Sequence, residues 1–230
     1  MAPDIRALLL DFDGTMLETE GPSYESWREL LAEHDYEFPL DAWIATVGTF
    51  NVVDPVAMLE EHLGRSLDGD GLRSRRMQRK RELIAEQALR PGVDRLVAAA
   101  RARGLRTAIV TSASRAWVDE HLGRVGLHGG WDCIVGADGD VARAKPEPIV
   151  YLEALDRLGL RADEAVAVED SPNGIRAAKR AGLTCIAFPN PITRRLDLSE
   201  ADAVVEDLDT VTLDDLLRVA STPEETSPSA

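Results

Sequence analysis

Side chains able to do chemistry recur along this sequence, each close behind a short apolar run. The set consists of Asp11, Asp13, Thr111, Ser112, Glu169 and Asp170, with Lys145 in the loop after a further apolar run. Taken singly, each acid or hydroxyl has a simpler interpretation as a turn residue or a helix cap, where such residues are common. Their recurrence behind successive runs favours one shared polar site.

The spacing of the first two acids indicates what such a site could bind. Asp11 and Asp13 lie on the same side of an extended chain, because side chains alternate along it. With Asp170, three carboxylates would then meet Lys145, and a bound phosphate ester would add about 1.5 to 2 further negative charges. A cation must balance this charge. Since all candidate ligands are oxygens, Mg²⁺ is favoured over zinc.

The apolar runs themselves predict the elements that position these residues. Buried strands are expected at 5–10, 107–110, 133–135, 165–168 and 184–188. Amphipathic helices are expected between them, at 93–103, 116–125, 148–158 and 172–181. This alternation predicts an α/β fold with a Rossmann-like parallel sheet. Ligands of such sheets gather at the carboxyl ends of the strands, where the polar residues lie.

One long stretch interrupts the alternation. Residues 16–87 show helical periodicity without a convincing strand, with helices expected at 24–34, 40–47, 55–63 and 72–88. We therefore expect a small all-helical domain at 16–87, inserted into an α/β core made of 1–15 and 88–220. Residues 221–230 are rich in Ser, Thr, Pro and Glu, and a disordered tail is expected there.

Composition excludes several classes of protein. The chain has 230 residues, 44% of them hydrophobic, and a formal net charge of −15, which argues against a general affinity for nucleic acid or anionic membranes. No apolar run approaches the roughly 18 to 20 residues that span a bilayer. Cys133 and Cys185 lie in apolar runs and are expected to be buried thiols. We expect a cytoplasmic protein.

Four segments together resemble the motifs of the haloacid dehalogenase-like hydrolase superfamily. They are Asp11-Phe12-Asp13-Gly14-Thr15, Thr111 with Ser112, Lys145-Pro146, and Glu169-Asp170-Ser171-Pro172-Asn173-Gly174. The order and intervals match over nearly the whole chain. A helical insertion directly after the first motif is similar to the cap of the subgroup that contains phosphoglycolate phosphatase and β-phosphoglucomutase.

The resemblance implies a division of roles within the first motif. Asp11 would attack phosphorus and become an aspartyl phosphate, which splits one difficult displacement into two. Asp13 would protonate the leaving group and then activate water. The expected reaction is hydrolysis of a small phosphorylated metabolite.

The resemblance also implies roles for the other motifs. Mg²⁺ would be held by Asp11, the main-chain carbonyl of Asp13, and Asp170, with Glu169 acting on the ion through water. Phosphoryl oxygens would be bound by Gly14, Thr111, Ser112 and Lys145.

Two alternatives are weighed against a simple phosphatase. A β-phosphoglucomutase-like phosphomutase would carry a cap histidine where this chain has Ser23, and the segment 45–51 lacks the mutase arginine. A receiver-type signalling domain shares acids, a hydroxyl and a lysine, but it is about half as long and uncapped.

A basic run from Arg73 to Arg81 is interpreted as a solvated helix face, with Arg73, Arg76 or Lys80 as minor candidates for guiding an anionic substrate.

Overall fold

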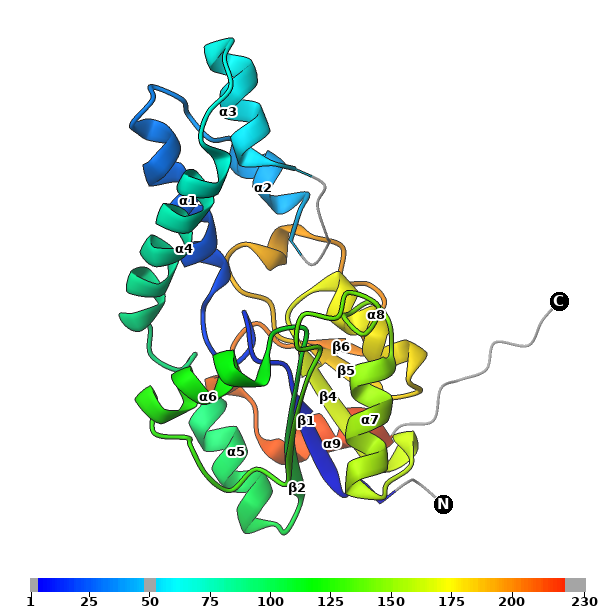
Figure 1. Ribbon diagram of the computed structural model, residues 1–230. Helices are drawn as coiled ribbons and strands as arrows, with labels where there is room; N and C mark the ends of the chain where they lie inside the picture. The colour runs from blue at the N-terminus through cyan, green and yellow to red at the C-terminus, as the bar shows by residue number, and fades with distance from the viewer. Residues whose placement is uncertain (1–3, 48–52, 222–230) are drawn as a thin grey trace, which may run out of the picture.

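A six-stranded parallel sheet forms the centre of the molecule (Figure 1). The computed structural model describes residues 4–47 and 53–221. The sheet has the order β3-β2-β1-β4-β5-β6. Its strands are β1 (Ala7–Leu10), β2 (Arg106–Thr111), β3 (Cys133–Gly136), β4 (Ala165–Glu169), β5 (Thr184–Ala187) and β6 (Ala203–Val204). The predicted α/β fold with a parallel sheet is confirmed, while β6 was not predicted because it is only two residues long.

The central strands are buried on both faces, as their continuous apolar runs predict. In β1, Leu8 and Leu10 pack into the hydrophobic cluster on one face of the sheet, whereas Ala7 and Leu9 pack into the cluster on the other. All four side chains are fully buried. β2 and β4 run one residue further than predicted, to Thr111 and Glu169, so two polar candidates belong to the strand ends themselves.

Helices cover both faces of the sheet. The helices α5 (Val93–Ala102), α6 (Arg115–Arg124) and α9 (Leu213–Ser221) contribute to one hydrophobic cluster, and α7 (Ile149–Leu158) and α8 (Pro172–Arg180) to the other. α9 is an addition to the prediction: among its acidic residues, Leu213 and Leu216 are buried against the sheet. Its last residue, Ser221, belonged to the predicted tail, and residues 222–230 lie outside the described part of the chain.

Four further helices form a separate helical unit beside the carboxyl end of the sheet (Figure 1). They are α1 (Glu20–Ala32), α2 (Leu40–Ile44), α3 (Pro55–Leu63) and α4 (Gly69–Ala85), and they enclose a small core of their own that includes Trp27, Leu31 and Leu59. Two of these helices begin earlier than predicted. A Glu18 side-chain oxygen accepts from the first amides of α1, and Asp68 caps α4 by accepting from the Gly71 amide. None of the helices in the described ranges has the length and apolar character needed to cross a membrane.

Candidate active site

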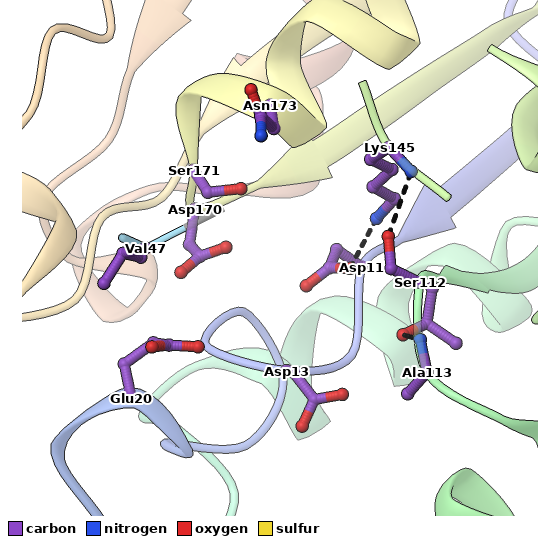
Figure 2. A pocket seen from close by; sticks show the side chains of 11 residues that line it. Asp11, Asp13, Glu20, Val47, Ser112, Ala113, Lys145, Asp170, Ser171 and Asn173 are labelled. Atoms are coloured by element: carbon purple, nitrogen blue, oxygen red, sulfur yellow. Dashed lines mark hydrogen bonds and ion pairs between the residues drawn. The ribbon is translucent and has the colours of Figure 1, made fainter. Parts of the chain in front are cut away.

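The predicted catalytic residues meet at the carboxyl end of the sheet. Asp11 follows β1, Thr111 ends β2, Asp170 follows β4, and Lys145 comes from the loop between β3 and α7. A cavity of about 210 Å³ opens there (Figure 2). It is lined by Asp11, Asp13, Glu20, Val47, Thr111, Ser112, Ala113, Lys145, Asp170, Ser171 and Asn173. The helical unit contributes Glu20 and Val47 to this lining, so the cavity lies between the sheet and the unit.

Lys145 is the central cation of this site. Its Nζ lies 2.5 Å from Asp11 Oδ1 and 2.5 Å from Glu169 Oε1, and it donates to the Val110 carbonyl oxygen at 2.8 Å. The side chain is only 6% exposed, so these contacts replace the hydration that the ammonium gives up. Burial alone would lower the pKa of Lys145, but the carboxylates of Asp11 and Glu169 outweigh burial and raise it. Lys145 therefore remains charged.

Burial acts in the opposite direction on the neighbouring acids. It raises the pKa of Asp11 to about 8, against the opposing influence of Lys145. Burial also raises the pKa of Asp170 well above its usual range, and the charges of Asp11 and Glu169 add to this effect. The cluster is thus short of positive charge, and a further cation would favour the ionised acids.

The buried acids also contain oxygens without partners. Asp11 Oδ2 and Glu169 Oε2 are both inaccessible and make no hydrogen bond within the described residues. One oxygen each from Asp11, Glu169 and Asp170 lies within 4.8 Å of the others. An all-oxygen donor set is typical of a hard divalent cation, so these residues fit the predicted Mg²⁺. Glu169 is itself part of this cluster, although it was predicted to act on the ion through water. The Asp13 side chain lies outside the cluster.

Tyr151 fixes the position of the Glu169 side chain. Its hydroxyl donates to Glu169 Oε1 at 2.5 Å, and the whole side chain is buried. Because Lys145 contacts the same oxygen, Glu169 Oε2 is the oxygen left for the cluster. Sequence reasoning missed Tyr151, which lies in an amphipathic helix and resembles an ordinary core residue.

Asp170 is fixed by a separate set of contacts. Asn190 donates from its side-chain amide to Asp170 Oδ2 at 2.7 Å. Gly14 packs beside the same oxygen, and its carbonyl oxygen accepts from Arg90 at 2.6 Å. A Cβ at Gly14 would lie 2.1 Å from Asp170 Oδ2, and the Gly14 φ of +83° is also unfavourable for other residues. The Gly14 amide donates to the Leu17 carbonyl oxygen at 2.8 Å, so the structure gives it a partner in the loop.

The hydroxyls of Thr111 and Ser112 each have a hydrogen available for a hydrogen bond to a ligand. Thr111 Oγ1 accepts from the Ala113 amide at 3.0 Å, and Ser112 Oγ accepts from the Lys145 amide at 3.1 Å. An oxygen that already accepts a bond keeps its own hydrogen for another partner. Since both residues line the cavity, both hydroxyls can donate to an anion there.

The Asp13 side of the cavity is built by the helical unit and α6. Trp117 Nε1 donates to Asp13 Oδ1 at 3.0 Å, and Lys80 Nζ lies 5.4 Å from the centre of the Trp117 ring. Burial raises the pKa of Glu20 to about 7, against the opposing charge of Lys80. The expected solvated face is thus wrong for Lys80, which is half-buried, although it holds for the exposed Arg73, paired with Asp54 at 2.7 Å.

Ser23 takes no part in the cavity. The residue is buried within α1, and its hydroxyl donates to the Thr19 carbonyl oxygen at 2.6 Å. Part of the segment predicted to lack the mutase arginine, at 48–51, lies outside the described residues.

The sequence and the fold were compared with those of known proteins. The family model for haloacid dehalogenase-like hydrolases matches residues 5–182. The chain is 38% identical over 204 residues to YhcW of Bacillus subtilis, provisionally named as a phosphatase, covering 89% of this chain and 92% of that protein. The structure of CbbY from Rhodobacter sphaeroides in complex with phosphate is 32% identical, with a TM-score of 0.73, and the match covers 92% of this chain and 99% of CbbY.

A third comparison concerns the fold alone. A β-phosphoglucomutase-type structure from Thermotoga maritima is 24% identical with a TM-score of 0.74, and the match covers 94% of this chain and 100% of that one. The same core and helical insertion therefore occur in proteins with different names. On the match to the family model and to relatives above 30% identity, the chain belongs to the haloacid dehalogenase-like hydrolase family.

Proposed function

We propose that this protein is a Mg²⁺-dependent phosphatase that hydrolyses a small phosphorylated metabolite, such as a sugar phosphate, through an aspartyl phosphate on Asp11. The observation that carries the proposal is the set of contacts made by the two carboxylate oxygens of Asp11. One of its oxygens is held by Lys145, and the other is buried without a partner beside the acid cluster at the cavity. Lys145 thereby fixes the orientation of the carboxylate, and the oxygen without a partner has little solvation to lose.

The first step forms the covalent intermediate. Asp11 forms a bond to phosphorus while the bond from phosphorus to the ester oxygen breaks, and its electron pair stays on that oxygen. Asp13 gives a proton to the same oxygen, which leaves as an alcohol. Thr111 and Ser112 donate toward the phosphoryl oxygens as charge spreads over them, and the positive charge of Lys145, which lines the same cavity, attracts those oxygens. When bound, Mg²⁺ would be held by Asp11, Asp170 and the Asp13 carbonyl, near Glu169, and would supply positive charge against the phosphoryl group.

The second step regenerates the enzyme. Asp13, now a carboxylate, takes a proton from water, whose oxygen bonds to phosphorus while the bond from Asp11 to phosphorus breaks. Phosphate leaves, and the two acids return to their starting protonation states. Keeping bulk water away from the intermediate favours an ordered transfer.

The helical unit supplies the remaining selectivity in this proposal. We assign residues 16–87 to a cap and residues 1–15 and 88–220 to the core. Since Glu20 and Val47 reach the cavity from the cap, contacts there would distinguish one leaving group from another. A variant of the Rhodobacter sphaeroides CbbY has been determined in complex with xylulose 1,5-bisphosphate, which supports a phosphorylated sugar as the class of substrate.

Hydrolysis is preferred over transfer within a sugar phosphate. A β-phosphoglucomutase-like phosphomutase would present a second acid-base group from the cap, but the residue at that position, Ser23, bonds to its own helix. A receiver-type signalling domain is disfavoured because the chain carries the four-helix unit α1 to α4, from which Glu20 and Val47 reach the cavity beside the acids.

The proposal is tested by phosphate release from a panel of sugar, nucleotide and short-chain acid phosphates, with and without Mg²⁺. We expect turnover of at least one sugar phosphate that requires Mg²⁺ and is abolished by Asp11→Asn. Asp163→Asn, an exposed change of the same chemistry, is the matched control and should retain full turnover. Turnover that persists in Asp11→Asn, or isomerised product in place of free phosphate, would contradict the proposal.

A further inference from the structure

The Asp13 side chain lies between two cavities. One is the cavity that contains Asp11 and Lys145, and the other, of about 250 Å³, lies between α4 and α6. The second cavity is lined by Asp13, by Lys80 of α4 and by Ser114 and Trp117 at the start of α6. Figure 2 shows the Asp13 carboxylate turned away from Asp11 and Asp170. Its orientation therefore needs a cause outside the acid cluster.

That cause is a single hydrogen bond. Trp117 Nε1 donates to Asp13 Oδ1 at 3.0 Å, across 104 residues of sequence. Within the described ranges, no hydrogen bond reaches Asp13 Oδ2. An indole has one donor and no acceptor, so it fixes one carboxylate oxygen and leaves the other to exchange a proton.

The indole is itself held firmly. Ser114 caps α6 by accepting from the Trp117 amide at 3.2 Å, which places Trp117 in the first turn of the helix. The Trp117 ring packs edge-on against His121, with centroids 4.2 Å apart, and His121 in turn stacks on Phe12 at 6.5 Å. Phe12 lies between the two aspartates in sequence, so the indole is connected through His121 to the same loop whose acid it orients.

We infer that Trp117 is the positioning residue for proton transfer to the leaving group, through its hydrogen bond to Asp13. The inference rests on the proposed function. In the first step the proton passes from Asp13 Oδ2 to the ester oxygen as the bond to phosphorus breaks, and Asp13 ends as a carboxylate whose Oδ1 still accepts from Trp117. Without the indole N–H, the carboxyl group can rotate and spends less time aligned with the ester oxygen.

The test compares two substrates that differ in their need for a proton. An alkyl phosphate leaves as a strongly basic alkoxide unless it is protonated, whereas 4-nitrophenyl phosphate leaves as a stable phenolate. The values of kcat/KM report the steps up to formation of the aspartyl phosphate. For Trp117→Phe, the ratio of kcat/KM for the alkyl substrate to that for the aryl substrate should fall by about 10-fold.

Trp131→Phe is the matched control, because the Trp131 indole donates to the Leu127 carbonyl oxygen at 2.8 Å, away from the acids. This variant should keep the wild-type ratio. Partial unfolding of Trp117→Phe lowers both rates equally and cancels in the ratio. If Trp117→Phe yields no folded protein, replacing Trp117 by 3-benzothienylalanine removes the N–H and keeps the ring shape.

Two results separate failure of this inference from failure of the proposed function. Equal losses for the two substrates, or no loss for either, would overturn the positioning role while wild-type turnover and its absence in Asp11→Asn still support the phosphatase. Absence of Mg²⁺-dependent phosphate release by the wild-type protein would instead contradict the proposed function itself.

Discussion

Two regions around the active-site cavity each hold acids near a cation, and only one of them brings the opposite charges into close contact. On the floor, formed by Asp11, Lys145, Tyr151 and Glu169, the cation touches both acids at 2.5 Å. On the helical wall, formed by Glu20, Lys80 and Trp117 along the second cavity, no ion pair joins Glu20 to Lys80 within the described part of the chain.

The difference shows where the protein itself pairs its charges: Lys145 contacts both acids of the floor, which still have oxygens free for a further cation. Burial raises the pKa of Glu20 and lowers the pKa of Lys80, so each group lacks the close partner that would hold its charge. The floor therefore has a fixed charge arrangement suited to one chemical step. The wall has charges that a bound substrate can still satisfy, which is where we expect the leaving group to be recognised.

The largest effect is expected from removing the cation of the floor. Lys145→Met leaves two buried acids without their partner, which should cost about 3–5 kcal/mol in the free energy of unfolding, or about 10 °C in Tm. Turnover should fall by about 10²–10³-fold. Thermal unfolding and steady-state kinetics measure both.

Lys179→Met is the control for this change. Lys179 pairs with Asp202 at 2.7 Å on the surface, and the loss of such a pair costs at most about 1 kcal/mol. If the two variants unfold at the same temperature, the floor is not the stabilising charge cluster that we describe.

The next effect concerns metal affinity. Tyr151→Phe removes the hydroxyl that holds Glu169, and we expect Mg²⁺ affinity to fall by about 10-fold in calorimetric titration. Tyr24→Phe is the control, because the Tyr24 hydroxyl donates to the Phe38 carbonyl oxygen within the helical unit. Both variants should lose about 1 kcal/mol of stability. Unchanged Mg²⁺ affinity in Tyr151→Phe would separate Glu169 from the metal site.

A smaller effect is expected on the wall. Lys80→Gln should lower kcat/KM for a phosphomonoester by about 5-fold at low salt, and the loss should shrink as salt screens the charge. Arg73→Gln is the control, since Arg73 lies on the same helix but pairs with Asp54 away from the cavity. Equal values of kcat/KM for the two variants would show that the wall does not attract the substrate.

The smallest effect is a pH dependence of stability. The pKa of Glu20 is raised by burial from 4.5 to about 7, so the folded protein binds this proton more tightly than the unfolded chain. Wild-type stability is therefore lost as pH rises from about 4.5 to about 7, and Glu20→Gln avoids that loss. The Tm of Glu20→Gln relative to the wild type should rise by a few degrees between pH 5 and pH 8.

Glu29→Gln provides a control of opposite sign. A hydrogen bond from Arg79 holds the pKa of Glu29 below its usual range, so its ionised form stabilises the fold above that range. Its relative Tm should fall slightly as pH rises. Parallel trends for the two variants would contradict the contrast between a satisfied surface acid and an unsatisfied acid in the wall.

The sequence predicted the floor far better than the wall. Asp11, Thr111 and Asp170 are placed by the ends of buried strands, and the apolar runs that make those strands are visible without any partner. The parallel sheet then brings the strand ends to one edge. Local pattern and overall fold agree at these residues, so the candidate site followed from the strands.

The wall depends on contacts that no local pattern encodes. Trp117 meets Asp13 across 104 residues of sequence. In α4, Arg73, Arg76 and Lys80 are three and four residues apart and share one face, so their spacing does not separate the exposed Arg73 from the half-buried Arg76 and Lys80. Which face meets the core is decided by packing against α1 and α6, and the sequence alone does not show it.

The central claim is that Asp11 becomes phosphorylated, and Asp13→Asn allows the most direct measurement. With 4-nitrophenyl phosphate, formation of the intermediate needs no proton donor, whereas its hydrolysis needs the Asp13 base. After an acid quench, peptide mass spectrometry should find the phosphoryl group on Asp11 in an amount equal to the burst of nitrophenolate. A burst of nitrophenolate with Asp11 unmodified, or with the label on another residue, would contradict the account.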